Sequence, residues 1–420
     1  MPDDRTWNIG RTIRRAFAAL LVGGALVQTI RIQAQPTSEP GPEVDEIRAL
    51  PYLAFSKKKA EDGRTGVLTF DRRRSSPGYN LYSNRNLCLA ELIDPHGDVV
   101  RSWRDPEPCR HWSNTELLAD GDLLVAGMAP VDRSRPGGDL AARFLLRMAW
   151  NGDVIWRTHL PAHHDAELTP RNRILTLTMG GRSIPAWDPA HEVRDNDLVL
   201  LSPRGTVLER RSLFDLLSAN AIGFELQRVA PDKGEIDLFH ANSVEWMHHA
   251  RLRGRHPLYD PGNVLVSIRH QDTIAVIDWH RRTLVWAWGR GEISGPHDAT
   301  VLDNGHILLF DNGLARGWSR VIELDPMGGE IAWEYRAPNP TDFFTASRGA
   351  SQRLANGNTL ITNSDSGQVF EVTPRGEIVW EFVNTHLDAE GHCATIVRMK
   401  RYEKSFFDNV RKSRRGRSSQ

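Results

Sequence analysis

The stretch Gly152-Asp-Val-Ile-Trp156 recurs as Gly329-Glu-Ile-Ala-Trp333 and Gly376-Glu-Ile-Val-Trp380, and each copy is a glycine followed by an apolar strand that ends in tryptophan. Weaker copies begin at Gly97, Gly205 and Thr283, so the pattern occurs six times, and its last three copies start 46 and 47 residues apart. That period is typical of a propeller blade of four short strands. We therefore predict an all-β fold, a six-bladed β-propeller.

A second hairpin accompanies this pattern. The dipeptides Asp120-Gly121, Asn304-Gly305 and Asn356-Gly357 each separate two apolar runs, and they predict tight turns because glycine accepts the positive φ required there. The last copy lacks an outer strand, so we predict that an N-terminal strand from residues 66–84 completes the last blade and removes a free sheet edge. The third copy has extra residues at roughly 210–238 and 248–261, which we interpret as a loop or helical insertion.

The two ends of the chain differ from the repeats. Residues 1–43 contain a basic segment, an apolar run over residues 16–30 and a polar linker, which is the layout of a secretory signal. The run is short for a spanning helix, but no clear cleavage site follows it, so an uncleaved membrane anchor and a buried N-terminal helix remain open. We expect residues 1–43 to direct export to the periplasm or the outer side of the inner membrane. Residues 44–400 would form the propeller, and the basic residues 401–420 a disordered tail.

Composition excludes some classes of function. The chain has 420 residues with 53 basic and 53 acidic side chains dispersed along it, so nothing favours a nucleic-acid partner. The three cysteines, Cys88, Cys109 and Cys393, are too few for a disulfide scaffold and lack the spacing of metal ligands. In an exported chain Cys88 and Cys109 either pair or remain buried thiols, and the sequence leaves both open.

One position just ahead of the second hairpin carries histidine repeatedly. When the six copies are aligned, its occupants are Ser113, His164, His240, His297, Gly349 and His392. Equivalent positions in a propeller are related by rotation about the central axis, so we predict that the imidazoles converge on the channel. They could instead be packing residues that were duplicated with the repeat. No acidic residue shares the position, so we expect neither a metal nor a cofactor. Histidine with arginine suits transfer of a sulfuryl or phosphoryl group, which needs a nucleophile, an acid and cations.

Three motifs extend this interpretation. They are His240-Ala-Asn-Ser, the Arg269-His-Gln segment, and Gly295-Pro-His-Asp, and together they resemble the bacterial arylsulfotransferase family over roughly residues 85–400. The resemblance implies a six-bladed propeller, often exported, that moves a sulfuryl group from an aryl sulfate ester to a phenolic acceptor. The reaction would need no nucleotide donor and would pass through a sulfohistidine.

The resemblance also implies roles for single residues. His297 would be the nucleophile, although the spacing after Arg269 differs from the family pattern. His240, Arg269 and His164 would bind the sulfate and phenolic oxygens and complete the catalytic group. Four further residues, from the same motifs or from the histidine position, are candidates for substrate binding: Asn242, His270, Arg316 and His392. Arg316 would be a rival sulfate ligand or would merely end a strand, and His392 matches the position without a family role.

Two other functions stay open. A non-catalytic propeller would use the same histidines and arginines to bind an anion or a partner. A quinone-dependent dehydrogenase also carries Gly-x-x-x-Trp repeats, but it usually has eight blades and a carboxylate-rich calcium site, and this sequence shows neither. The sequence also departs from the better-known members of the arylsulfotransferase family, because it shows neither their extra N-terminal β-domain nor the cysteine pair that some of them carry near the active site.

Overall fold

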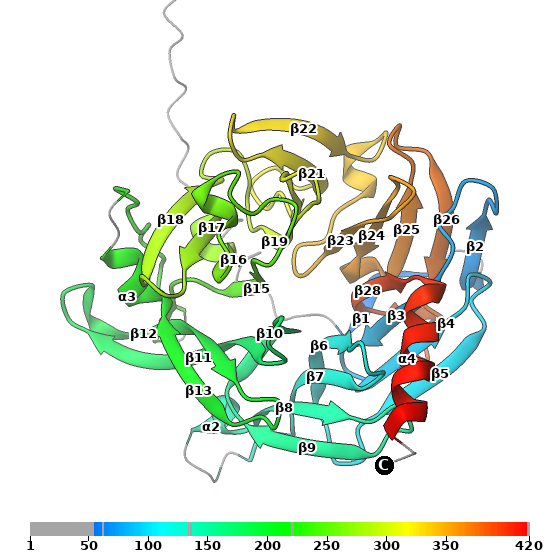
Figure 1. The fold of residues 1–420 in the computed structure, drawn as a ribbon, viewed down its shortest axis with the longest axis horizontal. Helices are drawn as coiled ribbons and strands as arrows, with labels where there is room; N and C mark the ends of the chain where they lie inside the picture. Colours follow the sequence, from blue (N-terminus) through cyan, green and yellow to red (C-terminus); the bar gives the residue numbers. More distant parts are fainter. Residues whose placement is uncertain are drawn as a thin grey trace, which may run out of the picture. The chain divides into compact units, whose positions relative to one another are not determined.

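Six antiparallel sheets form a ring around a central channel (Figure 1). The computed structural model describes residues 54–417, except residues 61–62, 133, 135–136, 220–221 and 233. The predicted signal or anchor segment, including residues 16–30, lies outside this part of the chain. No helix in the described part has the length and apolar character needed to cross a membrane. The six-bladed propeller predicted from the repeats is confirmed.

Each blade has its innermost strand at the channel. The first blade consists of β28 (Ile396–Tyr402), β3 (Tyr79–Asn84), β4 (Leu89–Ile93) and β5 (Val99–Arg104). The second consists of β6 (His111–Leu117), β7 (Leu123–Met128), β8 (Arg143–Met148) and β9 (Val154–His159). The third consists of β10 (Ala162–Leu168), β11 (Ile174–Ile184), β12 (Asp188–Leu201) and β13 (Val207–Ser212).

The other three blades follow the same order from the channel outward. The fourth consists of β15 (Ala241–Trp246), β16 (Asn263–Ile268), β17 (Thr273–Asp278) and β18 (Thr283–Trp288). The fifth consists of β19 (His297–Val301), β20 (Ile307–Asp311), β21 (Arg320–Asp325) and β22 (Glu330–Tyr335). The sixth consists of β23 (Ala350–Arg353), β24 (Thr359–Asn363), β25 (Gln368–Val372) and β26 (Ile378–Val383).

The ring closes at two places. The N-terminal strand β2 (Gly66–Phe70) pairs with β26 as a fifth, outermost strand of the sixth blade, as predicted. The predicted segment 66–84 also includes β3, but β3 belongs to the first blade, where it pairs with the C-terminal strand β28. An N-terminal strand, β2, therefore extends the last blade, and a C-terminal strand, β28, forms the inner strand of the first blade. A short sheet of β1 (Phe55–Lys59) and β27 (His392–Ala394) adds a further contact between the two ends.

The recurrent tryptophan links adjacent blades. Its indole N–H donates to a turn carbonyl of the following blade, from Trp156 to Pro203 at 3.1 Å and from Trp333 to Pro374 at 2.9 Å. Trp380 makes the equivalent bond to Pro95 at 2.9 Å, across the closure between the sixth and first blades. Apolar clusters fill each of the six blade interfaces within the described residues. The motif that reveals the repeat is therefore itself a contact between repeats.

The insertion in the third copy is confirmed. It contains the helix α3 (Leu213–Ser218) and the short strand β14 (Glu235–Asp237), which pairs in parallel with β12. Ser212 caps α3 by accepting the N–H of Asp215 at 3.1 Å. The second extra segment contains a 3₁₀ turn, η2 (Pro257–Tyr259). The first of these insertions leads directly into the segment that carries Asp237 and His240.

The C-terminal segment differs from the expected disordered tail. Residues Lys404–Arg417 form the helix α4, whereas the short helix α2 (Gly138–Ala141) lies between β7 and β8 of the second blade. Phe407 and Val410 of α4 are buried, and the Phe407 ring lies 4.9 Å from that of Tyr79. The basic charge of the segment suggested disorder, but its apolar residues recur at helical spacing and cover the first and second blades. Cys88 and Cys109 form a disulfide nearby, and Cys393 is a buried thiol.

We predict that closure depends on a buried ion pair. Arg401 of β28 bonds to Glu371 of the sixth blade and to Asn80 of β3, and both charged side chains are almost fully buried. Arg401→Met would leave the Glu371 carboxylate buried without its cation, which typically costs about 3–5 kcal/mol. Urea unfolding should show this loss, and Arg401→Met/Glu371→Gln should recover part of it. As a control, Arg251→Met at the exposed Arg251–Asp303 pair should change the unfolding free energy by less than about 1 kcal/mol. An equally small effect at Arg401 would contradict the prediction.

Candidate active site

Inner strands of the third, fourth and fifth blades bring three histidines together at the channel. His164 lies in β10, His240 directly precedes β15, and His297 begins β19. The Nε2 atoms of His164 and His240 are 3.2 Å apart. Both His164 and His240 have φ angles in the left-handed region, 62° and 45°, so the backbone is turned sharply where these side chains leave it. The positions that the aligned repeats placed near the channel therefore converge for these residues.

The hydrogen bonds of His297 fix its tautomer. Its Nδ1 lies 2.7 Å from Asn312 Oδ1 and 3.0 Å from the carbonyl oxygen of Gly295, and both are acceptors. The Asn312 amide is oriented because its Nδ2 donates to two carbonyl oxygens, of Thr345 and Arg348. The proton must therefore sit on Nδ1, and Nε2 is the unprotonated nitrogen. Nε2 accepts one long bond, 3.2 Å, from the backbone N–H of Arg348.

Burial keeps this imidazole neutral. It lowers the pKa of His297 to about 3, and the neighbouring Arg269 guanidinium acts in the same direction. The Asn242 amide donates to the carbonyl oxygen of Pro296 at 2.8 Å, which holds the residue just before His297 against the fourth blade. A neutral imidazole with its lone pair on a known nitrogen is the form needed for nucleophilic attack.

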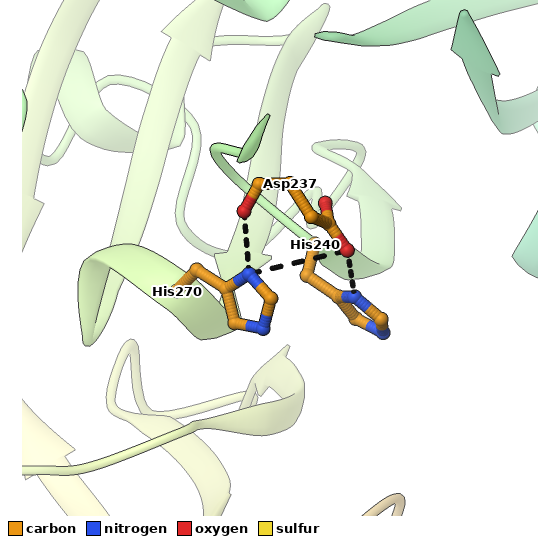
Figure 2. A group of neighbouring side chains, drawn as sticks. All are labelled: Asp237, His240 and His270. Carbon is orange, nitrogen blue, oxygen red and sulfur yellow. Dashed lines mark hydrogen bonds and ion pairs between the residues drawn. The ribbon is translucent and has the colours of Figure 1, made fainter. Parts of the chain in front are cut away.

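Asp237 supports two imidazoles at once (Figure 2). Its Oδ2 accepts from His240 Nδ1 at 2.5 Å, and its backbone oxygen accepts from His270 Nδ1 at 2.6 Å. Burial acts to raise the pKa of Asp237, but the two imidazoles outweigh it and hold this pKa below its usual value. The carboxylate thus directs the other nitrogen of His240 toward His164.

The Arg269-His-Gln motif forms a 3₁₀ turn, η3 (Arg269–Gln271), after β16, and all three side chains are buried. Arg269 Nη1 lies 2.7 Å from His270 Nε2, which must accept this bond because the arginine only donates. Gln271 Nε2 donates to the carbonyl oxygen of Leu238 at 2.9 Å. The motif therefore places a cation at the cluster and also holds the segment that carries Asp237 and His240.

Asp237, His240 and His270 also offer ligand atoms within 4.8 Å of one another, a grouping that a metal ion could use. No acidic residue occupies the aligned histidine position itself, since Asp237 lies three residues before His240. In the structure His240 Nδ1 hydrogen-bonds to the Asp237 carboxylate, whereas His270 Nδ1 bonds to the Asp237 backbone oxygen and lies 4.0 Å from the carboxylate, as Figure 2 shows. Asp388, Glu390 and His392 form a second such group, at the β1–β27 sheet.

Two candidates from the sequence have other surroundings. Arg316 Nη1 bonds to the buried carboxylate of Asp311 at 2.8 Å, and its guanidinium stacks on Trp318, which fits the strand-end role considered for it. His392 pairs with Lys59 across the β1–β27 sheet, and its Nδ1 bonds to Asp388 at 3.0 Å. The predicted convergence of His392 on the channel is therefore wrong. The inner strand β28 begins four residues later, and it is Val397 that lines the cavity beside His164.

Sequence reasoning missed two residues that hold the cluster. Asp237 lies in the insertion, outside the repeat alignment, and its only signal was its position three residues before His240. Asn312 lies in the Asp311-Asn-Gly segment, in which only the nearby Arg316 was predicted to bind substrate. Both were missed because a supporting side chain need not share the spacing of the residue that it supports.

The buried histidines predict acid sensitivity. Burial lowers the pKa of His270 to about 3 and holds the pKa of His163 and His164 well below its usual value. Below the unfolded-state value near 6.5, the unfolded chain takes up protons that the folded chain does not. The unfolding free energy should then fall with falling pH, by up to about 1.4 kcal/mol per pH unit for each such histidine.

Urea unfolding between pH 7 and pH 5 measures this slope. In His297→Gln the slope of the unfolding free energy against pH should be smaller by the contribution of one histidine. His280→Gln, at an exposed turn, should leave this slope unchanged. If His297→Gln kept the slope of the unmodified chain, the neutral, buried state of His297 would be disproved.

Comparisons with known proteins found a family match and similar folds. The arylsulfotransferase (ASST) family model matches residues 144–385, more than half of the chain. A solved structure of a protein of unknown function from Bacteroides caccae aligns with a TM-score of 0.51 and 14% identity, covering 77% of this chain and 98% of that one. A streptogramin B lyase aligns with a TM-score of 0.45 and 12% identity, covering 84% and 96%.

The likeness to the Bacteroides caccae protein shows the fold alone, because its identity to this chain is so low. No curated protein matches the sequence. The matched range includes His164, His240, Arg269 and His297, the residues that meet at the channel. By the match to its family model, the chain belongs to the arylsulfotransferase family.

Proposed function

We propose that this protein transfers a sulfuryl group from an aryl sulfate ester to a phenolic acceptor, with His297 as the covalent intermediate and without a nucleotide donor. The observation that carries the proposal is the tautomer of His297. Asn312 and Gly295 hold the proton on Nδ1, so the Nε2 lone pair is available at neutral pH without prior deprotonation.

In the first half-reaction, His297 Nε2 forms a bond to sulfur and the bond from sulfur to the aryl oxygen breaks. The incoming sulfur displaces the long bond from the Arg348 N–H, which is then free to donate to a sulfuryl oxygen. The imidazole ring becomes positively charged, and its Nδ1–H stays bonded to two acceptors that stabilise this charge. Arg269 supplies the fixed positive charge for the sulfuryl oxygens.

The departing aryl oxygen needs a proton. One proton must lie between the facing Nε2 atoms of His164 and His240, since two lone pairs would not approach to 3.2 Å. In this step His240 acts as an imidazolium, with its Nδ1–H on Asp237 and its Nε2–H toward His164, so that passing the shared proton to the phenolate leaves two neutral imidazoles. In the second half-reaction the acceptor phenol returns a proton to the pair, its oxygen bonds to sulfur, and the nitrogen–sulfur bond breaks. Protons and electron pairs balance over the cycle.

The Cys88–Cys109 disulfide supports export as a second part of the proposal. Disulfides form and persist mainly in oxidising compartments such as the periplasm. The pairing therefore agrees with the signal-like segment of residues 1–43, whether this segment is removed or kept as an anchor.

We predict covalent labelling of one histidine. Incubation with 4-nitrophenyl sulfate, without acceptor, should add the mass of one SO₃ group to the intact protein, and acid should remove it. His297→Asn should abolish the label, because no other nitrogen replaces Nε2. His392→Asn is the matched control and should label normally. If no aryl sulfate labels the protein although sulfate binds, the non-catalytic anion-binding function is favoured instead.

A second prediction concerns Asp237. Asp237→Asn should keep a hydrogen bond to His240 but remove the charge that supports its proton transfer. With 4-methylphenyl sulfate, whose phenolate leaves poorly, turnover should fall about 10²-fold or more, the usual share of general acid catalysis. With 4-nitrophenyl sulfate, which leaves without much help, the loss should be much smaller.

The control is Asp388→Asn, which changes an equivalent carboxylate–imidazole pair at His392 and should affect neither donor. Equal losses on both donors for Asp237→Asn would show that Asp237 only maintains the fold. The dependence on the leaving group therefore separates a positioning role from a structural one.

A further inference from the structure

A small cavity adjoins the imidazole cluster, and the proposed transfer of the sulfuryl group does not use most of it. Its volume is about 30 Å³, and its lining includes Arg85, His111, Arg143, His163 and Arg348. These residues come from the first, second, third and sixth blades. Among the described residues that line the cavity there is no carboxylate. Three guanidinium groups and three imidazoles, counting His164, surround a space large enough for a compact polar group.

His163, which lines this cavity, has a buried donor. Asn196 Nδ2 donates to His163 Nε2 at 3.1 Å, and the orientation of the amide is fixed because Asn196 Oδ1 accepts the N–H of Ala241. Burial keeps the pKa of His163 well below its usual value, so the ring is neutral and its proton sits on Nδ1. This Nδ1–H is buried and has no hydrogen-bond partner among the described residues. Buried donors without a partner are rare in proteins, and this one is suited to bind an acceptor oxygen.

The electrostatics of the cavity favour an anion. Burial lowers the pKa of His111 to about 2, and the charges of Arg85 and Arg143 add to this effect. Arg348 is anchored by Asp365 at 3.0 Å and by Thr395 at 3.0 Å, so its position is fixed. A neutral imidazole donor and oriented guanidinium groups are the partners that oxyanions prefer.

The cavity and the sulfuryl site share residues. His164 lines the cavity and faces His240, while Arg348 lines the cavity and donates its backbone N–H to His297. A phenol whose hydroxyl lies at the imidazole cluster therefore has this cavity beside it.

We propose that the cavity binds a compact oxyanion carried by the acceptor, so that the preferred acceptors are phenols with a second, acidic substituent. This inference rests on the proposed function, since it names the substrate class of the same site. A carboxylate and a sulfonate present the same chemistry, and the experiment separates them.

The test compares isosteric acceptors with 4-nitrophenyl sulfate as donor. They are 4-hydroxyphenylacetate, its neutral amide, and 4-hydroxybenzenesulfonate. We expect kcat/KM for the carboxylate to exceed that for the amide at least about tenfold, the effect of one charge-assisted hydrogen bond. Arg143→Gln should reduce this ratio toward one, and Arg85→Gln serves if Arg143→Gln fails to fold. If the sulfonate alone is preferred, the acidic group is a sulfonate rather than a carboxylate.

Arg110→Gln is the matched control. Arg110 is a neighbouring, half-exposed arginine that pairs with Asp139 at 3.9 Å and does not line the cavity, so the ratio should remain unchanged. The proposal is overturned if acid and amide react equally well in the unmodified enzyme. It is also overturned if Arg143→Gln slows labelling of His297 and both acceptors by the same factor, because Arg143 would then serve the sulfuryl group.

A binding measurement separates this proposal from the proposed function. Calorimetric titration of 4-hydroxyphenylacetate and its amide needs no turnover. Tighter binding of the acid, lost in Arg143→Gln, would support the cavity even if no aryl sulfate labels the protein. Equal binding of acid and amide would reject the cavity even if labelling of His297 succeeds.

Discussion

The innermost strand of each blade has a hydrogen-bonding edge that no other strand pairs, and the ring depends on satisfying it. Side chains of the preceding blade do so. Asp165 Oδ2 accepts the N–H of Val244 at 3.0 Å, and Glu245 Oε2 accepts the N–H of Val301 at 2.7 Å. Asp298 Oδ2 accepts the N–H of Ser351 at 2.8 Å. An unpaired buried N–H is costly, so these carboxylates fix the inner strands of the fourth, fifth and sixth blades against their neighbours.

The same contacts aim the site. His164 precedes Asp165, and His297 precedes Asp298. In both cases the histidine is followed directly by an acidic residue that holds the next blade. Arg398 of β28 balances these charges, because it reaches Asp165 at 3.4 Å and Asp298 at 3.3 Å across the channel. The stability of the ring and the position of the imidazoles therefore have a common origin. A change to one of these acids should disturb both.

Much of the architecture was predictable from local pattern. The six copies of the pattern that begins Gly-x-hydrophobic gave the number of blades, and its three full copies end in a Trp that bonds to the next blade. The convergence of His164, His240 and His297 was predictable from the same repeated pattern. His392 was misplaced because the chain adds a turn and the short strand β27 before β28, which the repeat pattern does not show. The C-terminal segment was wrongly predicted to be disordered, because its many basic residues outnumber the apolar residues that lie on one face of α4.

The sequence by itself therefore determined the fold class, the order of the blades and the convergence of three recurrent histidines on the channel, since these follow from a repeated spacing. Only the tertiary structure decided which nitrogen of His297 carries the proton, that Asp237 supports His240, and that His163 presents an unpaired donor to a cavity lined by arginines. The partner of His297 and the neighbours of His163 come from other parts of the chain, whereas Asp237 lies in an insertion that the repeat pattern does not cover. Spacing along the sequence carries no information about distant partners, because they meet only when the chain folds.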